Sequence, residues 1–152
     1  MNRSDFADLV PEGGVVPDLR ALDKAGVLAA LAHQSAGFAG VAETLILERL
    51  RAREALGSTG FGLGAAIPHA RIEGLVGVVV ILARLAAPVD FGALDGEPVD
   101  LLVLLLSPEA GGADHLKALA RISRALRYPD ILDALRAAPD AAAMRAIIGA
   151  PA

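Results

Sequence analysis

The sequence predicts one α/β domain, a sandwich in which a mixed, mostly buried β-sheet is flanked by helices on both faces. Two apolar runs, 76–83 and 101–106, are rich in Val, Ile and Leu and do not alternate with polar residues, which is typical of strands buried on both faces. The segment between these runs carries turn signals but no helical pattern, so we expect the two strands to be antiparallel neighbours. At 152 residues the chain is long enough for a single domain, which we place at residues 5–149.

The composition excludes several classes of function. Aromatic residues make up 3% of a chain that is 55% hydrophobic, which favours helices packed on a sheet over an aromatic-lined ligand pocket. A net charge of −4 argues against a nucleic-acid partner. The absence of cysteine excludes disulfides, thiolate nucleophiles and cysteine metal sites. No apolar run reaches the ~20 residues of a membrane span, so we expect a cytoplasmic protein without direct membrane insertion.

In the N-terminal third, we expect a short edge strand followed by two helices. Val15 and Val16 stand before Pro17, as in an edge strand. A helix over 19–35 is predicted from apolar residues on one side and glycines at its end. The apolar side comprises Leu19, Leu22, Val27, Leu28 and Leu31, and the glycines are Gly37 and Gly40. A second helix over 41–55 places Arg53 in its last turn, just before a glycine-rich segment.

After the second apolar run, three helices are expected. The first runs from Asp114, whose side chain can cap a helix, to about Arg127, and it places His115 in its first turn. Pro129 then leads into a short helix over 131–137, and Pro139 and Asp140 start a last helix that ends near Ile148. The helix that begins at Asp114 has an expected inner stripe of Leu116, Leu119, Ile122 and Leu126 and an outer stripe of Lys117, Arg121 and Arg124. That basic stripe is either a solvated face or a surface for an acidic partner.

The segment 57–69, GSTGFGLGAAIPH, is the centre of the functional prediction. The four glycines among its first eight residues allow sharp bends and the close approach of a ligand. Pro68 prevents a helix from continuing through the segment. We therefore expect a glycine-rich loop, a very short strand and, at the end of that strand, His69. Reactive side chains are often presented in this way, on a loop backed by a rigid scaffold.

His69, Arg53 and His115 form a candidate phosphoryl-transfer site if the fold brings them together. A neutral imidazole with a pKa of about 6.5 can act as a nucleophile near neutral pH and hold a phosphoryl group as a phosphoramidate. Because that group carries its charge on three equatorial oxygens, the protein has mainly to position it and to supply donors. Arg53 offers a forked donor and His115 opens a helix N-terminus, and Ser58 and Thr59 are candidate phosphate contacts. Such a site suits a relay better than a hydrolase.

Other interpretations of these residues remain open. His69 could be a loop histidine that bonds to backbone, and His115 a first-turn residue that faces water, while His33 is taken as an ordinary surface or half-buried residue. A dinucleotide fingerprint has the wrong glycine spacing here, and Pro68 forbids the helix that must follow it. A zinc site lacks a His-x-x-x-His spacing, and Ser58 lacks the elbow of a hydrolase nucleophile. We expect neither a metal nor a cofactor.

The segment 53–69 resembles the active-site segment of the enzyme IIA component of the bacterial phosphotransferase system, fructose–mannitol type. The segments 88–91, 94–101 and 114–116 also match, so the similarity spans nearly the whole chain. It is closest to the nitrogen-regulatory branch of that family, whose members are single domains. The resemblance implies an enzyme IIA type-2 domain over residues 5–149, built as an α/β sandwich with a mixed sheet between helices.

The resemblance also implies roles for individual residues. His69 falls on the position that accepts a phosphoryl group from the phosphohistidine of a small HPr-like phosphocarrier protein. Arg53 falls on that of a phosphate-contacting arginine, and His115 on that of a second active-site histidine. Leu63 stands where relatives often have Asn, which removes a polar group from the loop, and Ala70 stands where many have Gly.

Two functions are compatible with this resemblance. The first is a phosphohistidine carrier with a regulatory role, whose phosphorylation state decides which target proteins it binds. The second is a sugar-specific IIA component that passes the phosphoryl group to a IIB component for fructose- or mannitol-type uptake. The sequence contains no fused IIB domain and no membrane segment, which favours the regulatory carrier. Either protein would be a phosphotransferase-type relay rather than a conventional turnover enzyme.

Overall fold

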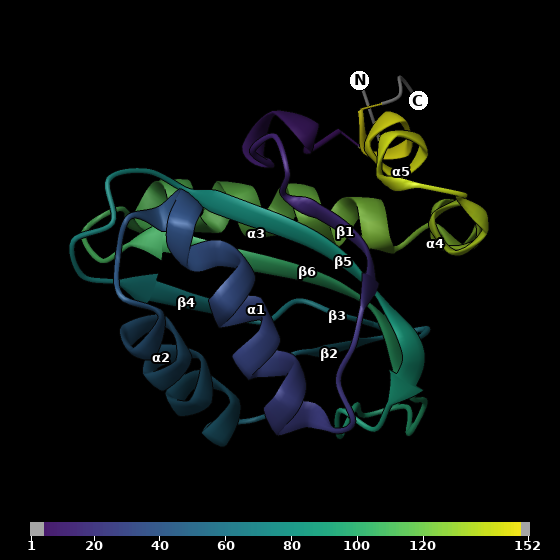
Figure 1. The fold of residues 1–152 in the computed structure, drawn as a ribbon, viewed down its shortest axis with the longest axis horizontal. Coiled ribbons are helices and arrows are strands. Elements are labelled where there is room, and N and C mark those ends of the chain that lie inside the picture. The colour runs from purple at the N-terminus through teal and green to yellow at the C-terminus, as the bar shows by residue number, and fades with distance from the viewer. Residues whose placement is uncertain (1–4, 150–152) are drawn as a thin grey trace.

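The computed structural model describes residues 5–149 and contains a mixed sheet of six strands in the order β1-β5-β6-β3-β2, with β4 also paired to β6 (Figure 1). The strands are β1 Val15–Leu19, β2 Gly60–Gly62, β3 Ala65–Ala66, β4 His69–Ile72, β5 Val79–Val89 and β6 Val99–Pro108. β5 and β6 are antiparallel neighbours, with Val80 opposite Leu105, so the predicted pairing is confirmed. The first strand of this pair starts at Val79 and not at Val76, whose side chain is exposed. β1 runs parallel to β5, and β3 and β4 run parallel to β6.

Helices cover both faces of this sheet, as predicted (Figure 1). The helices are α1 Lys24–Ala39, α2 Glu43–Ala55, α3 Gly112–Leu126, α4 Pro129–Ala137 and α5 Ala141–Ile148, and a 3-10 turn, η1, spans Ala7–Leu9. α1 and α2 pack on one face, and α3, α4 and α5 contribute to the core on the other. Along β6, Leu101, Val103 and Leu105 enter the core under α3, whereas Leu102 and Leu104 enter the core under α1 and α2. This alternation explains why the run lacks polar residues.

The first helix begins later than predicted from the sequence. Leu19 belongs to β1, which continues through Pro17 because an edge strand tolerates a missing N–H. Asp23 caps α1 by accepting a hydrogen bond from the Gly26 N–H at 2.7 Å, so Leu22 lies before the helix, and its side chain is fully exposed. The helix continues past Gly37 to Ala39, and Gly40 ends it in a left-handed conformation with φ 68°.

The predicted face of α3 also needs correction. Its N-cap is Gly111 and not Asp114, which lies in the first turn. His115 points inward and is buried, whereas Leu116, assigned to the inner stripe, is 63% exposed. The observed inner residues are His115, Ala118, Ile122, Ala125 and Leu126. The sequence places Leu116 on the inner stripe because it is apolar. In the fold, the neighbouring His115 faces the sheet instead.

Arg121 is not part of a free basic stripe. Its guanidinium donates to the Asp5 carbonyl oxygen at 2.9 Å and pairs with the Asp8 carboxylate. These contacts fasten the N-terminal segment across α3.

The glycine-rich segment forms a tight antiparallel hairpin of β2 and β3, with left-handed backbone at Gly62, Leu63 and Gly64. Leu63 has φ 59°, a conformation that costs a leucine roughly 1 kcal/mol. Its N–H is bound by the Asp95 carboxylate at 3.0 Å and its carbonyl by the Arg136 guanidinium at 2.6 Å. These bonds hold the residue in its strained conformation, which an asparagine would adopt more easily.

We therefore expect Leu63→Asn to stabilise the protein by about 0.5–1 kcal/mol, since the backbone bonds remain and the left-handed conformation becomes less costly. Urea unfolding followed by far-UV circular dichroism measures the change. Leu94→Asn is the matched control, because Leu94 is fully exposed and has a negative φ. An equal effect at both positions would mean that the conformation of Leu63 carries no cost.

Candidate functional site

His69 lies at the junction of two short strands that pair with the same neighbour. The expected single strand ending in this histidine is wrong in detail, because His69 begins β4, and the preceding strand, β3, ends at Ala66. Both strands run along β6, with Ala66 opposite Leu102 and His69 opposite Leu105. Pro68 lies between them and accepts a hydrogen bond from the Leu105 N–H at 3.0 Å. The imidazole is therefore carried by backbone that is paired to a buried central strand.

The hydrogen bonds of His69 define which ring nitrogen is available. Nδ1 lies 2.8 Å from the Ile67 carbonyl oxygen, and because a carbonyl can only accept, Nδ1 carries the hydrogen. Nε2 then has a free lone pair and accepts a hydrogen bond from Arg53 Nε at 3.2 Å. Burial lowers the pKa of His69, and the charge of Arg53 lowers it further against the opposing effect of the Ile67 carbonyl. The ring is thus a neutral imidazole with Nε2 as its nucleophilic atom.

His115 lies beside this ring in the first turn of α3. The two ring centroids are 5.5 Å apart, and the Ser107 hydroxyl at the end of β6 lies 2.7 Å from His115 Nδ1. Burial lowers the pKa of His115, and the neighbouring His69 and Arg71 lower it further. The interpretation of His115 as a residue that faces water is therefore wrong.

The two imidazoles open into a cleft of about 330 Å³ that is rich in arginine. Its lining consists of Arg49, Ala52, Arg53, Leu56, His69, Ala70, Arg71 and His115. Arg49 and Arg71 were not singled out from the sequence, although their spacing carried a signal. Arg49 precedes Arg53 by one helical turn, and Arg71 follows His69 by two residues on a strand, so each pair shares a face. The cleft thus places three arginines around an imidazole nitrogen that carries a lone pair.

Ser58 and Thr59, the candidate phosphate contacts, are engaged within the protein and are not among the residues that line this cleft. The Ser58 hydroxyl donates to the Phe91 carbonyl oxygen at 2.7 Å. The Thr59 hydroxyl donates to the carboxylate of Glu54. In this arrangement, the two hydroxyls stabilise the glycine-rich segment. His33, by contrast, is exposed, and it pairs with Glu43 at 2.9 Å.

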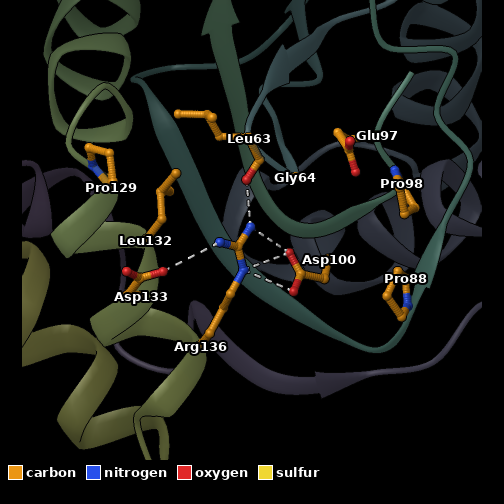
Figure 2. A pocket seen from close by; sticks show the side chains of 10 residues that line it. All are labelled: Leu63, Gly64, Pro88, Glu97, Pro98, Asp100, Pro129, Leu132, Asp133 and Arg136. Atoms are coloured by element: carbon orange, nitrogen blue, oxygen red, sulfur yellow. Dashed lines mark hydrogen bonds and ion pairs between the residues drawn. The ribbon is translucent and has the colours of Figure 1, made fainter. Parts of the chain in front are cut away.

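A second, larger groove of about 520 Å³ lies between the β2–β3 hairpin and α4, with Pro88, Pro98 and Pro129 among its walls (Figure 2). Figure 2 shows the guanidinium of Arg136 reaching Asp100 and the Leu63 carbonyl, at distances of 2.6 to 3.1 Å. Because these bonds use its donors, Arg136 serves as a clamp between α4 and the hairpin. The groove contains no imidazole, so the chemistry points to the cleft at His69.

Two further properties concern residues 5–149, which the structure describes. No group of three or more histidine, cysteine or acidic side chains in this range could hold a metal ion. In the same part of the chain, every helix is too short or too polar to cross a membrane.

Comparison with known proteins gives concordant matches. Residues 8–150 match the model of the family described as phosphoenolpyruvate-dependent sugar phosphotransferase system, EIIA 2. A nitrogen regulatory protein of Bradyrhizobium diazoefficiens is 46% identical over 146 residues, which cover 96% of this chain and 95% of that protein. The crystal structure of nitrogen regulatory protein IIA-Ntr from Neisseria meningitidis superposes with a TM-score of 0.88 at 32% identity, covering 93% of this chain and 97% of that one.

A more distant structure shares the fold and has been solved with a partner. It is enzyme IIA for mannitol from Escherichia coli, in complex with its phosphorylated enzyme IIB, with a TM-score of 0.77 at 14% identity over 91% of this chain and 95% of that one. At this identity, the likeness concerns the fold alone.

We expect NMR titration to give midpoints below 6.5 for both His69 and His115. Arg53→Met should raise the pKa of His69 because it removes a nearby positive charge, whereas Arg20→Met, at a side chain that is 80% exposed, should leave it unchanged. Because both folded pKa values lie below the unfolded ones, their contribution to stability is complete above pH 6.5. It is lost as the pH falls through the folded values. Midpoints above 6.5 would contradict the buried, neutral site.

Proposed function

Because this chain belongs to the EIIA 2 family of the phosphoenolpyruvate-dependent sugar phosphotransferase system and is a homologue of nitrogen regulatory proteins, we propose that it is a regulatory phosphocarrier that accepts a phosphoryl group on His69. The observation that carries the proposal is the bonding of the imidazole. Nδ1 is held by the Ile67 carbonyl, and Nε2 offers its lone pair to the cleft at Arg53. The proposed donor is the phosphohistidine of an HPr-like carrier.

The transfer step balances without the release of a proton at His69. Nε2 attacks phosphorus and the N–P bond forms as the donor's N–P bond breaks, with the electron pair returning to the donor imidazole. Nδ1 keeps its hydrogen on the Ile67 carbonyl throughout. The depressed pKa of His69 favours this step, because a protonated imidazole has no lone pair to offer.

The surrounding cations supply the electrostatic part of catalysis. In phosphoryl transfer the protein mainly positions the group and neutralises its oxygens. Arg53 contacts Nε2 in the free protein, so an arriving phosphoryl group meets its guanidinium first. Arg71 and Arg49 line the same cleft, and His115, oriented by Ser107, lies on its other side. We assign these residues to binding of the phosphoryl oxygens.

Phosphorylation would also provide the regulatory output. A phosphoryl group adds up to about two negative charges at pH 7, in a cleft whose lining otherwise contains three arginines and two imidazoles. It would therefore cancel most of the positive charge that the three arginines bring to the cleft, which is sufficient to exchange one set of docked target proteins for another.

A sugar-specific role is the second candidate, because a protein of the same fold, enzyme IIA for mannitol, forms a complex with phosphorylated enzyme IIB. The 46% identity to a nitrogen regulatory protein, which extends over nearly the full length of both chains, favours regulation. The two roles differ in what happens to the bound phosphoryl group. A regulatory carrier retains it when mixed with a fructose- or mannitol-type IIB component, whereas rapid transfer to that component would favour the uptake role.

We expect radiolabelled phosphoenolpyruvate, enzyme I and an HPr-like carrier to place one acid-labile phosphate on this protein. His69→Ala should abolish labelling because it removes the accepting nitrogen. His33→Ala is the control and should label fully, since His33 is exposed and lies outside the cleft lining. Equal labelling of His69→Ala and the unaltered protein would refute the assignment.

Arg53→Lys should slow phosphoryl transfer about tenfold, because an ammonium replaces a forked donor by a point charge. Arg51→Lys is the matched control, since this neighbouring arginine is exposed and does not line the cleft. Rapid-quench measurement of transfer from the phosphorylated carrier gives both rates. A rate for Arg53→Lys equal to that of the control would remove Arg53 from the site.

A further inference from the structure

Glu54 is a buried acid beside the cleft that the transfer chemistry does not use. It follows Arg53 in the last turn of α2, but its side chain is only 6% exposed and is absent from the cleft lining. Lys24 Nζ lies 2.7 Å from its carboxylate. The Thr59 N–H donates to it at 3.2 Å, and the Thr59 hydroxyl donates to its other oxygen. Both carboxylate oxygens therefore have partners.

These contacts tie the glycine-rich segment to the first helix. Lys24 is the first residue of α1, and its ammonium also donates to the Phe91 carbonyl oxygen at 3.2 Å and lies 4.7 Å from the Phe91 ring centroid. Ser58 donates to the same carbonyl at 2.7 Å. Glu54 thus joins two helices, the segment at Ser58 and Thr59, and the loop at Phe91 in one network.

The network reaches the nucleophile through Arg53. One guanidinium nitrogen, Nη1, donates to the Gly57 carbonyl oxygen at 2.9 Å, and Nε donates to His69 Nε2 at 3.2 Å. The Gly57 N–H donates to the backbone carbonyl oxygen of Glu54 at 3.1 Å. Because Gly57 also lies two residues before Thr59, its carbonyl is held between the end of α2 and the segment that the Glu54 side chain binds. An arginine side chain has several rotatable bonds, and the Gly57 carbonyl is the contact that selects the rotamer pointing at His69.

We propose that Glu54 is a positioning residue for phosphoryl transfer: by holding Thr59, it fixes the Gly57 carbonyl and so keeps the Arg53 guanidinium on Nε2 of His69. This inference rests on the proposed function. Arg53 Nη1 remains bonded to the Gly57 carbonyl when the phosphoryl group arrives, and the other guanidinium donors turn from His69 Nε2 to the phosphoryl oxygens. The Arg53 guanidinium is thereby oriented before the phosphoryl group arrives. Such orientation in advance is a source of rate acceleration.

Glu54→Gln tests the inference with a nearly isosteric change. The carboxylate accepts through both oxygens, whereas an amide offers one oxygen and directs its NH₂ at a donor. We expect kcat, measured as the maximal single-turnover rate of transfer from the phosphorylated carrier, to fall about tenfold with KM for the carrier unchanged, since no residue of the cleft lining is itself substituted. The Arg53 Nε–H should exchange faster with solvent in ¹⁵N NMR than it does in the unaltered protein. Glu43→Gln, an exposed acid on the same helix, should match the unaltered protein in both measurements.

A double variant separates positioning from stability. Glu54→Gln leaves the partly buried Lys24 ammonium without its carboxylate partner, and an uncompensated charge of this kind destabilises the folded protein. Adding Lys24→Met removes that charge, and we expect it to restore the midpoint of thermal unfolding without restoring kcat. If kcat recovers together with stability, or if Glu54→Gln transfers at the normal rate, the inference is wrong.

The NMR arm keeps this test distinct from that of the proposed function. The exchange rate of the Arg53 Nε–H is measured on the unphosphorylated protein, so it reports on the Glu54 network even if His69 never becomes labelled. Absence of labelling on the unaltered protein would overturn the phosphocarrier role. An unchanged Arg53 signal in Glu54→Gln would overturn the positioning role alone.

Discussion

The hydrogen bond between His69 Nδ1 and the Ile67 carbonyl oxygen, 2.8 Å long, is the contact on which the chemistry of this site depends. It assigns the ring hydrogen to one nitrogen and leaves the lone pair on the other. That carbonyl lies between β3 and β4, both of which run parallel to β6. The backbone one residue before Pro68 therefore sets the tautomer of His69.

The central strand β6 places both imidazoles. His69 is paired opposite Leu105, and Ser107, two residues further along the same strand, binds Nδ1 of His115. Because residues two apart on a strand share a face, the backbone of β6 sets the spacing that brings the two rings to 5.5 Å. The buried character of β6 makes this frame rigid, since side chains from both helical layers fill its two faces.

The charges around the site are arranged in two layers. Three arginines line the cleft, and one of them, Arg49, is also paired with Glu73. Behind Arg53, the buried carboxylate of Glu54 is balanced by Lys24 and lies outside the cleft lining. The acid therefore does not compete with a phosphoryl group for the arginines, although it follows one of them directly in the chain. Arg53 and Glu54 are adjacent and carry opposite charges, but because the Glu54 side chain is buried, only Arg53 lines the cleft.

The sequence by itself determined the sheet, the helical layers and the candidate trio, because unbroken apolar runs require burial on both faces and because glycines and a proline around a histidine restrict the backbone locally. It could not determine the start of α1 at Lys24 or the inward turn of His115, since a cap and a helix phase depend on what the neighbouring elements offer. Only the tertiary structure brought Arg49, Arg71 and Ser107 to the imidazoles and withdrew the hydroxyls of Ser58 and Thr59 into the network of Glu54 and Phe91. Hydrogen bonds between residues distant in the chain are decided by strand register and packing, which local spacing does not specify.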